Sequence, residues 1–469
     1  MTGSGTLLDP YVIWDVNDLQ SVEADLDAYY ELGQDIDASA TVGWNGGAGF
    51  LPLGQIGSPP VNAFVGHFDG KGHVISHLFI NRPTGQVGLF RYVGAPGYSP
   101  VIQNVGLEDV DFTAKSVGGL IQYLEGGTVS NCYVTGQVVA ARDAGGLIQY
   151  VGNGDIDDCY TTCTVTSGPN AGDDAGGLIQ YMQNGTVDNC YATGNISGGG
   201  DVGGLMEYLR AGQVQRCHAT GNVSTGRVAA GFIVYSYGDV SDCYATGDVS
   251  GGTAVAGFIH DVVEGTVTRC CATGTVTAPT GSAGGFATYI EGTVTESYAL
   301  GAVSGGGAFN WCGGFFGYVS GGYVHDCYTR SDVSGDAQYS GGFGGRVYAG
   351  TVENCYSAGA VTATGASTGG FLGMLSGGAV TNCFWDTETS GWNASAAGTG
   401  KTTEEMKSMD TFLDAGWDID GSALDINNGY PFLGWQALAG TIWLITVAPP
   451  PPPSHIEINK AYALSREEL

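Results

Sequence analysis

The feature that most constrains this chain is a pair of small residues, Gly-Gly or Ala-Gly, followed by leucine or phenylalanine. The pair recurs ten times, and its second glycine advances in steps of 27, 31, 27, 27, 26, 28, 29, 28 and 28 residues. The ten second glycines are Gly119, Gly146, Gly177, Gly204, Gly231, Gly257, Gly285, Gly314, Gly342 and Gly370. Self-similarity with a period of 20–50 residues is the sequence signature of a repeat architecture.

A second landmark keeps the same period. An apolar residue such as Val129 lies three residues before a position that is cysteine in nine copies and Ser297 in one. The nine cysteines are Cys132, Cys159, Cys190, Cys217, Cys243, Cys270, Cys327, Cys355 and Cys383. The apolar runs are short, β-branched or aromatic, and glycine, which makes up 82 of 469 residues, separates them. This pattern is typical of strands and turns, and no helix template fits it.

A unit of three short apolar runs cannot bury its own hydrophobic face, but a stack of such units can. The sequence therefore predicts an all-β fold, a three-sided parallel β-solenoid with about 27 residues per turn. Strands of successive turns would lie about 4.8 Å apart. Val129 and Cys132 are an odd number of residues apart, so we expect a corner or bulge between them if both point inward.

The cysteine column is predicted to be a core ladder of reduced thiols. Stacked positions lie about 4.8 Å apart, whereas the Cβ atoms of a disulfide need about 3.8 Å. A linear column also lacks the tetrahedral convergence of a metal site. Cys163, Cys271 and Cys312 lie outside the column. If Cys163 or Cys271 is exposed, it could cross-link subunits.

Two tyrosine columns follow the same period. The first holds Tyr123, Tyr150, Tyr181, Tyr208, Tyr235, Tyr289 and Tyr318, with Asp261, Arg346 and Met374 as substitutes. A charged residue is tolerated there, so we expect this column to face solvent at least in part. It is either a stacked ladder that stiffens the protein or a candidate binding face for neutral glycans. The second column directly follows the cysteines and is expected on the outside.

A specific family resemblance rests on these units. Gly176-Gly177-Leu178 through Asn189-Cys190-Tyr191-Ala192-Thr193-Gly194 resembles the GLUG repeat of bacterial surface and adhesin-like proteins. Phe68-Asp69-Gly70-Lys71-Gly72-His73 and residues 386–436 resemble the pieces that flank such arrays. The resemblance covers most of residues 1–437 and departs at the tail. It implies a right-handed parallel β-helix and an adhesive or structural role, without an established catalytic site.

Five segments are predicted along the chain. They are an N-terminal cap and lead-in segment (1–63), the β-solenoid (64–383), a C-terminal cap (384–437), an extra strand with a polyproline linker (438–453) and a tail (454–469). An open solenoid end exposes strand edges, so each end needs a cap. Apolar spacing predicts a short capping helix over 17–30, and a capping box predicts another over 402–413. Four tryptophans are expected to cover the last turn, namely Trp385, Trp392, Trp417 and Trp435.

The tail is a predicted docking peptide for a protein partner in a larger assembly. It carries Ile458, Tyr462, Leu464 and Leu469 behind five prolines that form a stiff spacer. The alternative is a disordered terminus.

The charge excludes several classes of partner. The formal net charge is −31, with only 15 Lys and Arg, so we expect no nucleic acid and no anionic membrane surface. No stretch is apolar enough to insert into a membrane, and the first residues lack the features of a signal peptide.

Catalytic and metal sites are not expected. Residues 398–402 imitate a phosphate-binding loop, but Ser395 stands where the loop needs glycine. His67, Asp69, His73 and His77 are assigned to turns and packing rather than to a metal. Sugar cleavage needs paired carboxylates, but the acids here scatter, as at Glu125, Glu207, Asp261, Glu264 and Glu291. Calcium on loops such as 155–158 or 172–174 is the one cofactor left open.

These observations favour a non-enzymatic, structural or adhesive solenoid on an extracellular surface or fibre, docked through its tail. A bacteriophage virion appendage or decoration protein is the alternative, because virions assemble in the cytoplasm, where free thiols survive. A polysaccharide-degrading β-helix enzyme is a distant third. The ligand, the host and any homo-oligomeric state stay open.

Overall fold

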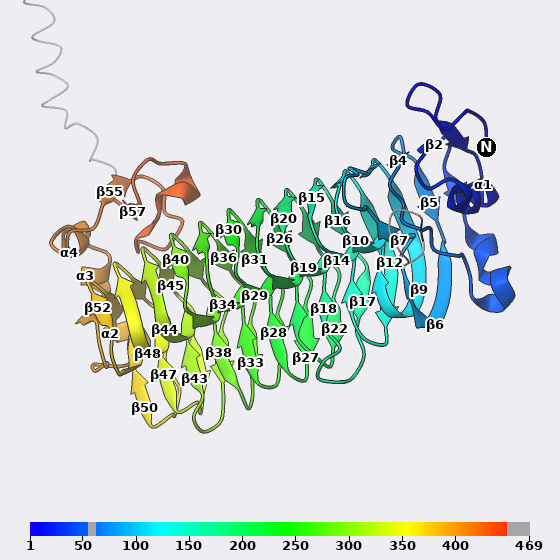
Figure 1. Ribbon diagram of the computed structural model, residues 1–469. Coiled ribbons are helices and arrows are strands. Elements are labelled where there is room, and N and C mark those ends of the chain that lie inside the picture. The colour runs from blue at the N-terminus through cyan, green and yellow to red at the C-terminus, as the bar shows by residue number, and fades with distance from the viewer. Residues whose placement is uncertain (55–61, 448–469) are drawn as a thin grey trace, which may run out of the picture. The chain divides into compact units, whose positions relative to one another are not determined.

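Successive copies of the repeat lie directly over one another in the computed structural model, which describes residues 1–54 and 62–447. Strand β10 (Ile121–Leu124) pairs in parallel with β14 (Ile148–Val151), and β14 pairs with β19 (Ile179–Met182), each time joining like positions. The same register continues through a parallel β-solenoid of about 13 turns with about 27 residues per turn. The predicted all-β solenoid is therefore confirmed (Figure 1).

A turn of the solenoid holds up to five short strands, where the apolar runs predicted three. In the turn that begins at Leu178 they are β19, β20 (Gly185–Asp188), β21 (Tyr191–Ala192), β22 (Ile196–Gly198) and β23 (Val202–Gly203). The first two belong to one large sheet and the other three to a second. The backbone bends at a corner between β20 and β21, where Asn189 has a φ of 50°.

That corner is the one predicted between the valine and the cysteine. Val129 lies in β11 (Thr128–Ser130), and Cys132 lies just before β12 (Tyr133–Ala140). Between them Asn131 has a φ of 51°, in the left-handed region, and both Val129 and Cys132 are fully buried. The equivalent left-handed residues of later copies are Asp158, Asn189, Arg216, Asp242, Arg269, Glu296, Asp326, Asn354 and Asn382. Asn and Asp accept this conformation most readily among residues with a side chain.

The repeated glycine pair lies where backbones of neighbouring turns approach closely. A Cβ atom added to Gly177 would lie 2.0 Å from the carbonyl oxygen of Gly204, its equivalent in the next turn. The second residue of the pair is therefore glycine in every copy. The first position is glycine in eight copies, and Ala230 and Ala256 occupy it in the other two.

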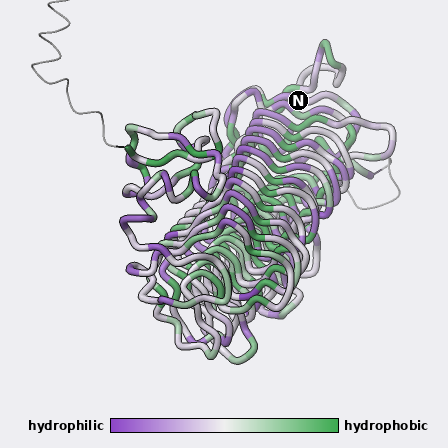
Figure 2. The backbone as a smooth tube through the Cα atoms, turned by 90° about the vertical axis from the view of Figure 1, so that its left-hand side faces the viewer, coloured by the Kyte–Doolittle hydropathy of each residue, from purple (hydrophilic) through white to green (hydrophobic). Residues whose placement is uncertain are grey.

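The bulky residue after the pair fills the interior. Leucine occupies this position in four copies, and phenylalanine follows in six. Phe232, Phe258, Phe286, Phe315, Phe343 and Phe371 are fully buried, and the centroids of successive rings lie 4.6 to 5.0 Å apart. Bands of like hydropathy consequently run from coil to coil (Figure 2).

The N-terminal cap contains less helix than its apolar spacing predicts. Helix α1 spans Val16–Ser21 with Asp15 as its N-cap, and a 3-10 turn continues over Val22–Ala24. The predicted helix over 17–30 ends there, because β2 (Tyr29–Leu32) pairs in parallel with β1 (Tyr11–Ile13) and β4 (His67–Asp69). Sheet pairing thus outweighs local helical spacing at Tyr30.

The chain divides into two compact units, Met1–Thr402 and a second unit that begins at Thr403. The first unit contains β53 (Phe384–Asp386), α2 (Thr387–Ser390) and β54 (Thr399–Lys401), and Trp385 is buried there with its indole N–H donating to the carbonyl of Trp392 at 3.1 Å.

The second unit is a small α/β assembly. It contains α3 (Thr403–Met406), α4 (Met409–Leu413) and a three-stranded sheet of β55 (Ile419–Ser422), β56 (Phe432–Leu433) and β57 (Trp443–Thr446). The predicted helix over 402–413 is two short helices, and the predicted extra strand corresponds to β57. Trp417 packs against Trp443 inside this unit, with ring centroids 4.7 Å apart. The polyproline stretch and the tail lie outside the described residues.

Candidate functional site

The cysteine column lies inside the solenoid. All nine of its cysteines are at most 2% exposed. The backbone N–H of Cys159 lies 3.3 Å from the sulfur of Cys190 in the next turn, and the same contact joins Cys217 to Cys243. In the copy with serine, the N–H of Cys270 donates to the hydroxyl of Ser297 at 3.2 Å. A backbone N–H at the corner is therefore accepted by the hydroxyl of Ser297 and by four of the sulfurs, those of Cys159, Cys190, Cys217 and Cys243.

Three of the thiols, those of Cys159, Cys355 and Cys383, are poorly suited to nucleophilic or redox chemistry. Burial raises the pKa of the Cys159, Cys355 and Cys383 thiols well above the usual range, and a thiol that stays protonated is a weak nucleophile. All twelve cysteines are free. Cys163 and Cys271, the candidates for cross-linking if exposed, are 1% and 9% exposed.

The first tyrosine column begins one copy before the predicted set, at Tyr92, and its first five rings stack face to face. Successive ring centroids are 4.5 to 5.1 Å apart and successive ring planes differ by 2 to 14°, from Tyr92 to Tyr208. The rings are half-buried. Because each inner ring has a neighbour on both faces, this part of the column offers mainly ring edges and hydroxyl groups to a ligand.

The stacking ends at Tyr235, whose ring is tilted by 45° to that of Tyr208, one copy before Asp261 interrupts the column. Tyr235 and Tyr289 both turn edge-on to His260, with ring centroids 5.5 and 5.2 Å away. His260 is buried, and burial lowers its pKa to about 3, so it is neutral at pH 7. Burial and the nearby Glu291 raise the pKa of Asp261 to about 7. Further along, Tyr318 packs against Trp311 rather than continuing the stack.

The second aromatic column lies on the outside of the corner only in part. Its rings stack with interplanar angles of 3 to 10°, for example Tyr133 on Tyr160 and Tyr191 on His218. Tyr133, Tyr160 and Tyr191 are half-buried. Later members differ from the prediction, since Tyr328 and Tyr356 are at most 1% exposed.

A buried polar ladder that the sequence reasoning missed lies beside the tyrosines. The side-chain amides of Gln122, Gln149 and Gln180 each donate to the next member, over 2.8, 2.7 and 3.0 Å, and the last acceptor is the carboxylate of Glu207. All four residues are at most 8% exposed. The repeated Leu-Ile-Gln-Tyr of three consecutive copies is the signal that could have revealed it.

Glu207 brings this ladder next to a row of carboxylates. Burial, Asp174 and Asp201 raise the pKa of Glu207 well above its usual range. Asp174 accepts a hydrogen bond from the backbone N–H of Asp201 at 2.8 Å, and burial raises the pKa of both carboxyls. Arg227 lies 3.2 Å from Asp201, and the hydroxyl of Tyr235 donates to it at 2.9 Å. Asp174 and Asp201 occupy the same position in successive copies, three residues before the second glycine of the pair. Of the acids that the sequence suggested were scattered, Glu207 lies beside them.

The three histidines that were assigned to turns and packing do not converge. His67 stacks on Tyr29 at 4.4 Å, His73 contacts Asp35 at 3.0 Å, and His77 lies 3.4 Å from Asp37. Among residues 1–54 and 62–447, no group of three or more histidine, cysteine or acidic side chains could hold a metal ion.

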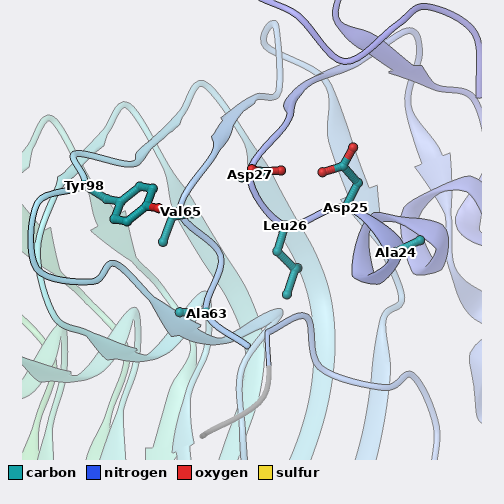
Figure 3. A pocket seen from close by; sticks show the side chains of 7 residues that line it. All are labelled: Ala24, Asp25, Leu26, Asp27, Ala63, Val65 and Tyr98. Atoms are coloured by element: carbon teal, nitrogen blue, oxygen red, sulfur yellow. The ribbon is translucent and has the colours of Figure 1, made fainter. Parts of the chain in front are cut away.

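A hollow of about 300 Å³ lies near the N-terminal cap (Figure 3). The loop with Asp25 and Asp27 forms one side, and Tyr98 lies on the opposite side. A hydrogen bond with Asp27, burial and the charge of Asp27 raise the pKa of Asp25. Asp25 and Asp27 are hydrogen-bonded to each other. The residues that line this hollow do not indicate a particular ligand.

Two further findings concern membranes and the tail. Over the described ranges, helices are too short or too polar to cross a bilayer. The predicted docking residues Ile458, Tyr462, Leu464 and Leu469 lie outside the described residues.

The stacked strands and the columns of like side chains together define the class of protein. It is a parallel β-solenoid built from sequence repeats. The family model for the GLUG motif matches residues 336–362, one turn of the solenoid, and the resemblance to GLUG-motif repeat proteins is confirmed. The chain is also similar to halomucin of Haloquadratum walsbyi, with 39% identity over 143 residues, which are 29% of this chain and 2% of halomucin.

Two more comparisons extend this finding. A protein of Evansella cellulosilytica, provisionally described as a Gly-rich membrane protein, is 33% identical over 138 residues, which are 28% of this chain and 15% of that protein. A crystal structure from Bacteroides ovatus, provisionally described as an immunoglobulin A1 protease, covers 92% of this chain and 95% of its own chain at 17% identity. Its TM-score of 0.29 is too low to support an argument.

Proposed function

We propose that this chain is a non-enzymatic structural and adhesive solenoid, displayed on a surface or fibre. The observation that supports this proposal most directly is that the reactive side chains contact one another from turn to turn. Thiols accept backbone N–H groups, phenol rings stack on phenol rings, and amides donate to amides. Catalysis needs such groups aimed at a substrate, whereas ladders stabilise the stack.

The relatives and the charge support a place at a surface. One relative is named halomucin, and the other is provisionally described as a membrane protein. A net charge of −31 keeps a large exposed β protein soluble and apart from its copies. We further propose that the tail, residues 454–469, attaches the solenoid to a larger assembly.

Localisation of the protein on cells tests the proposed display at a surface. Antibodies raised against the solenoid should label intact cells that express the natural gene, and mild protease treatment of those cells should remove the label. Label that appears only after the cells are opened would contradict surface display.

Assays of hydrolysis test the proposal that the chain is not an enzyme. The full chain should release no reducing ends from neutral or acidic polysaccharides and no fragments from casein or immunoglobulin A over a day. Turnover that survives repurification and disappears with Glu207→Gln or Asp201→Asn would establish an enzyme instead.

A virion appendage remains the second candidate, and the twelve free thiols favour it, because reduced cysteines are typical of proteins assembled in the cytoplasm. Antibody label on purified phage particles, absent from uninfected cells, would support the virion. Deletion of residues 449–469 should abolish incorporation into either assembly, and a truncated chain that still joins its assembly would exclude the tail as the anchor.

A further inference from the structure

The corner of the solenoid is built differently in its first turns. Asp69 pairs with Gln103, and Val74 pairs with Gly106. The chain therefore takes five residues to go from Asp69 in β4 to Val74 in β5 (Val74–Ser76). In the next turn it takes three, from Gln103 to Gly106. The two extra residues form a projecting turn in which Lys71 and Gly72 have φ values of 54° and 83°.

The second aromatic column also starts at this place. Tyr133 stacks on Tyr160, with centroids 4.8 Å apart and an interplanar angle of 4°. On its other side Tyr133 is in register with Gly106, which has no side chain. No ring therefore precedes Tyr133 in the column, and its ring lies over the glycine, since a Cβ atom on Gly106 would lie 2.3 Å from Cζ of Tyr133.

Two hollows open beside this position. One of about 380 Å³ is lined by Asp69, Lys71, Gly72, Asn104 and Asn131. The other, of about 260 Å³, shares three of these residues and adds the aromatic side; it is lined by Gly72, Asn104, Val105, Gly106, Asn131, Tyr133 and Tyr160. Sites for small molecules have volumes of about 300 Å³ upward, so the joined hollows suit one or two sugar rings.

The polar side chains of the hollows are held in fixed positions. The amide of Asn131 donates to Asn104 at 2.8 Å, and the amide of Asn104 donates to Asp69 at 3.0 Å. Asp69 also accepts the backbone N–H of Lys71 at 2.8 Å. The ammonium group of Lys71 lies 3.8 Å from Glu31 and is half-exposed. Carboxylate, amide and ammonium groups thus surround the end of an aromatic stack.

We propose that these adjoining hollows bind the terminal pyranose residues of a neutral glycan, an inference that rests on the proposed adhesive function. The C–H face of a sugar ring packs on tyrosine, and its hydroxyl groups bond to Asp69, Lys71 and Asn131. Asp69 and Glu31, within a chain of charge −31, disfavour an anionic glycan. Lys71 at the mouth disfavours a cation.

Calorimetry of the full chain tests the proposal. Cellohexaose, xylohexaose, mannohexaose and laminarihexaose are titrated separately, and at least one should bind. Asn131→Gly removes an amide from the hollow and keeps the left-handed corner, which glycine adopts freely. It should weaken binding at least tenfold. The matched control Asn189→Gly makes the same change at a corner two turns away and should stay within twofold of the parent chain.

The outcomes separate this site from the proposed function. Lys71→Met and Tyr133→Leu should each weaken binding as well, while near-ultraviolet circular dichroism shows that the fold is kept. Binding that is equal in the Asn131 and Asn189 variants overturns the site, even if the chain still adheres to cells or fibres. Adhesion with no affinity for any of the four oligosaccharides overturns the neutral-glycan assignment and leaves the adhesive role intact.

Discussion

Replacing Glu207 with glutamine should stabilise the solenoid, because it extends a ladder of amides and removes a buried acid. Gln180 already donates to this side chain at 3.0 Å, and a glutamine oxygen accepts the same hydrogen bond. Glu207 is 5% exposed and faces Asp174, Asp201 and, further away, Asp143, all of which raise its pKa.

The size of the effect follows from linkage. Each pH unit by which the folded-state pKa of Glu207 is raised above its ordinary value of 4.5 lowers stability at pH 7 by about 1.4 kcal/mol. The folded-state pKa is raised, so this loss is absent below pH 4.5 and grows as the pH rises toward the folded-state value. Glu207→Gln should therefore recover up to about 3 kcal/mol at pH 7 and nothing at pH 4.

Urea unfolding of the full chain at pH 4 to 8, followed by circular dichroism at 218 nm, measures this gain. Glu264→Gln, at an exposed acid two turns further along the solenoid, is the control for the loss of one negative charge. The reasoning fails if Glu207→Gln is no more stable than Glu264→Gln at pH 7, or if its advantage is the same at pH 4 and pH 8.

Three further predictions concern the core and the corner. Phe258→Ala opens a cavity in the stacked phenylalanines, so the free energy of unfolding should fall by about 3–5 kcal/mol; a loss below 1 kcal/mol would contradict close packing. Asn189→Ala should lose about 1–2 kcal/mol, since alanine is strained at a φ of 50°, whereas Asn189→Gly should lose less. Burial raises the pKa of Cys163 and Cys312 to about 12, so iodoacetamide at pH 8 should label them only in urea, and mass spectrometry checks this.

The stacking of the solenoid could be predicted from the sequence because every constraint recurs. A residue that must be glycine next to the following backbone, such as Gly177, is glycine in all ten copies. The odd spacing between Val129 and Cys132 predicted the corner at Asn131 as well. The first cap was harder, since the helical spacing up to Tyr30 competes with sheet pairing that only the folded neighbours reveal.

The placement of Glu207 beside the carboxylate row and the corner hollows could not be predicted in the same way. Asp174 and Asp201 share one position of the repeat, three residues before the second glycine of the pair, but Glu207 belongs to another position, and only the folded turn brings it close to them. The hollow at Asn131 depends on an irregularity, a corner two residues longer than the next and a missing side chain at Gly106. A search for periodic patterns passes over features of this kind. The interruption of the tyrosine column at Asp261 was visible as a substitution, but the edge-on rings around His260 were not.

The strict nearest-neighbour pairing of the coils has a consequence for how such genes change. A duplication or loss of one whole 27-residue unit leaves every other coil with an equivalent neighbour, so it should be tolerated, whereas a partial unit would break the alignment of both sheets. Recombination between similar coding repeats supplies changes of the tolerated kind. Each event would lengthen or shorten the solenoid by about 5 Å. The length of the solenoid can thus vary between related genes while the side chains of every coil stay the same.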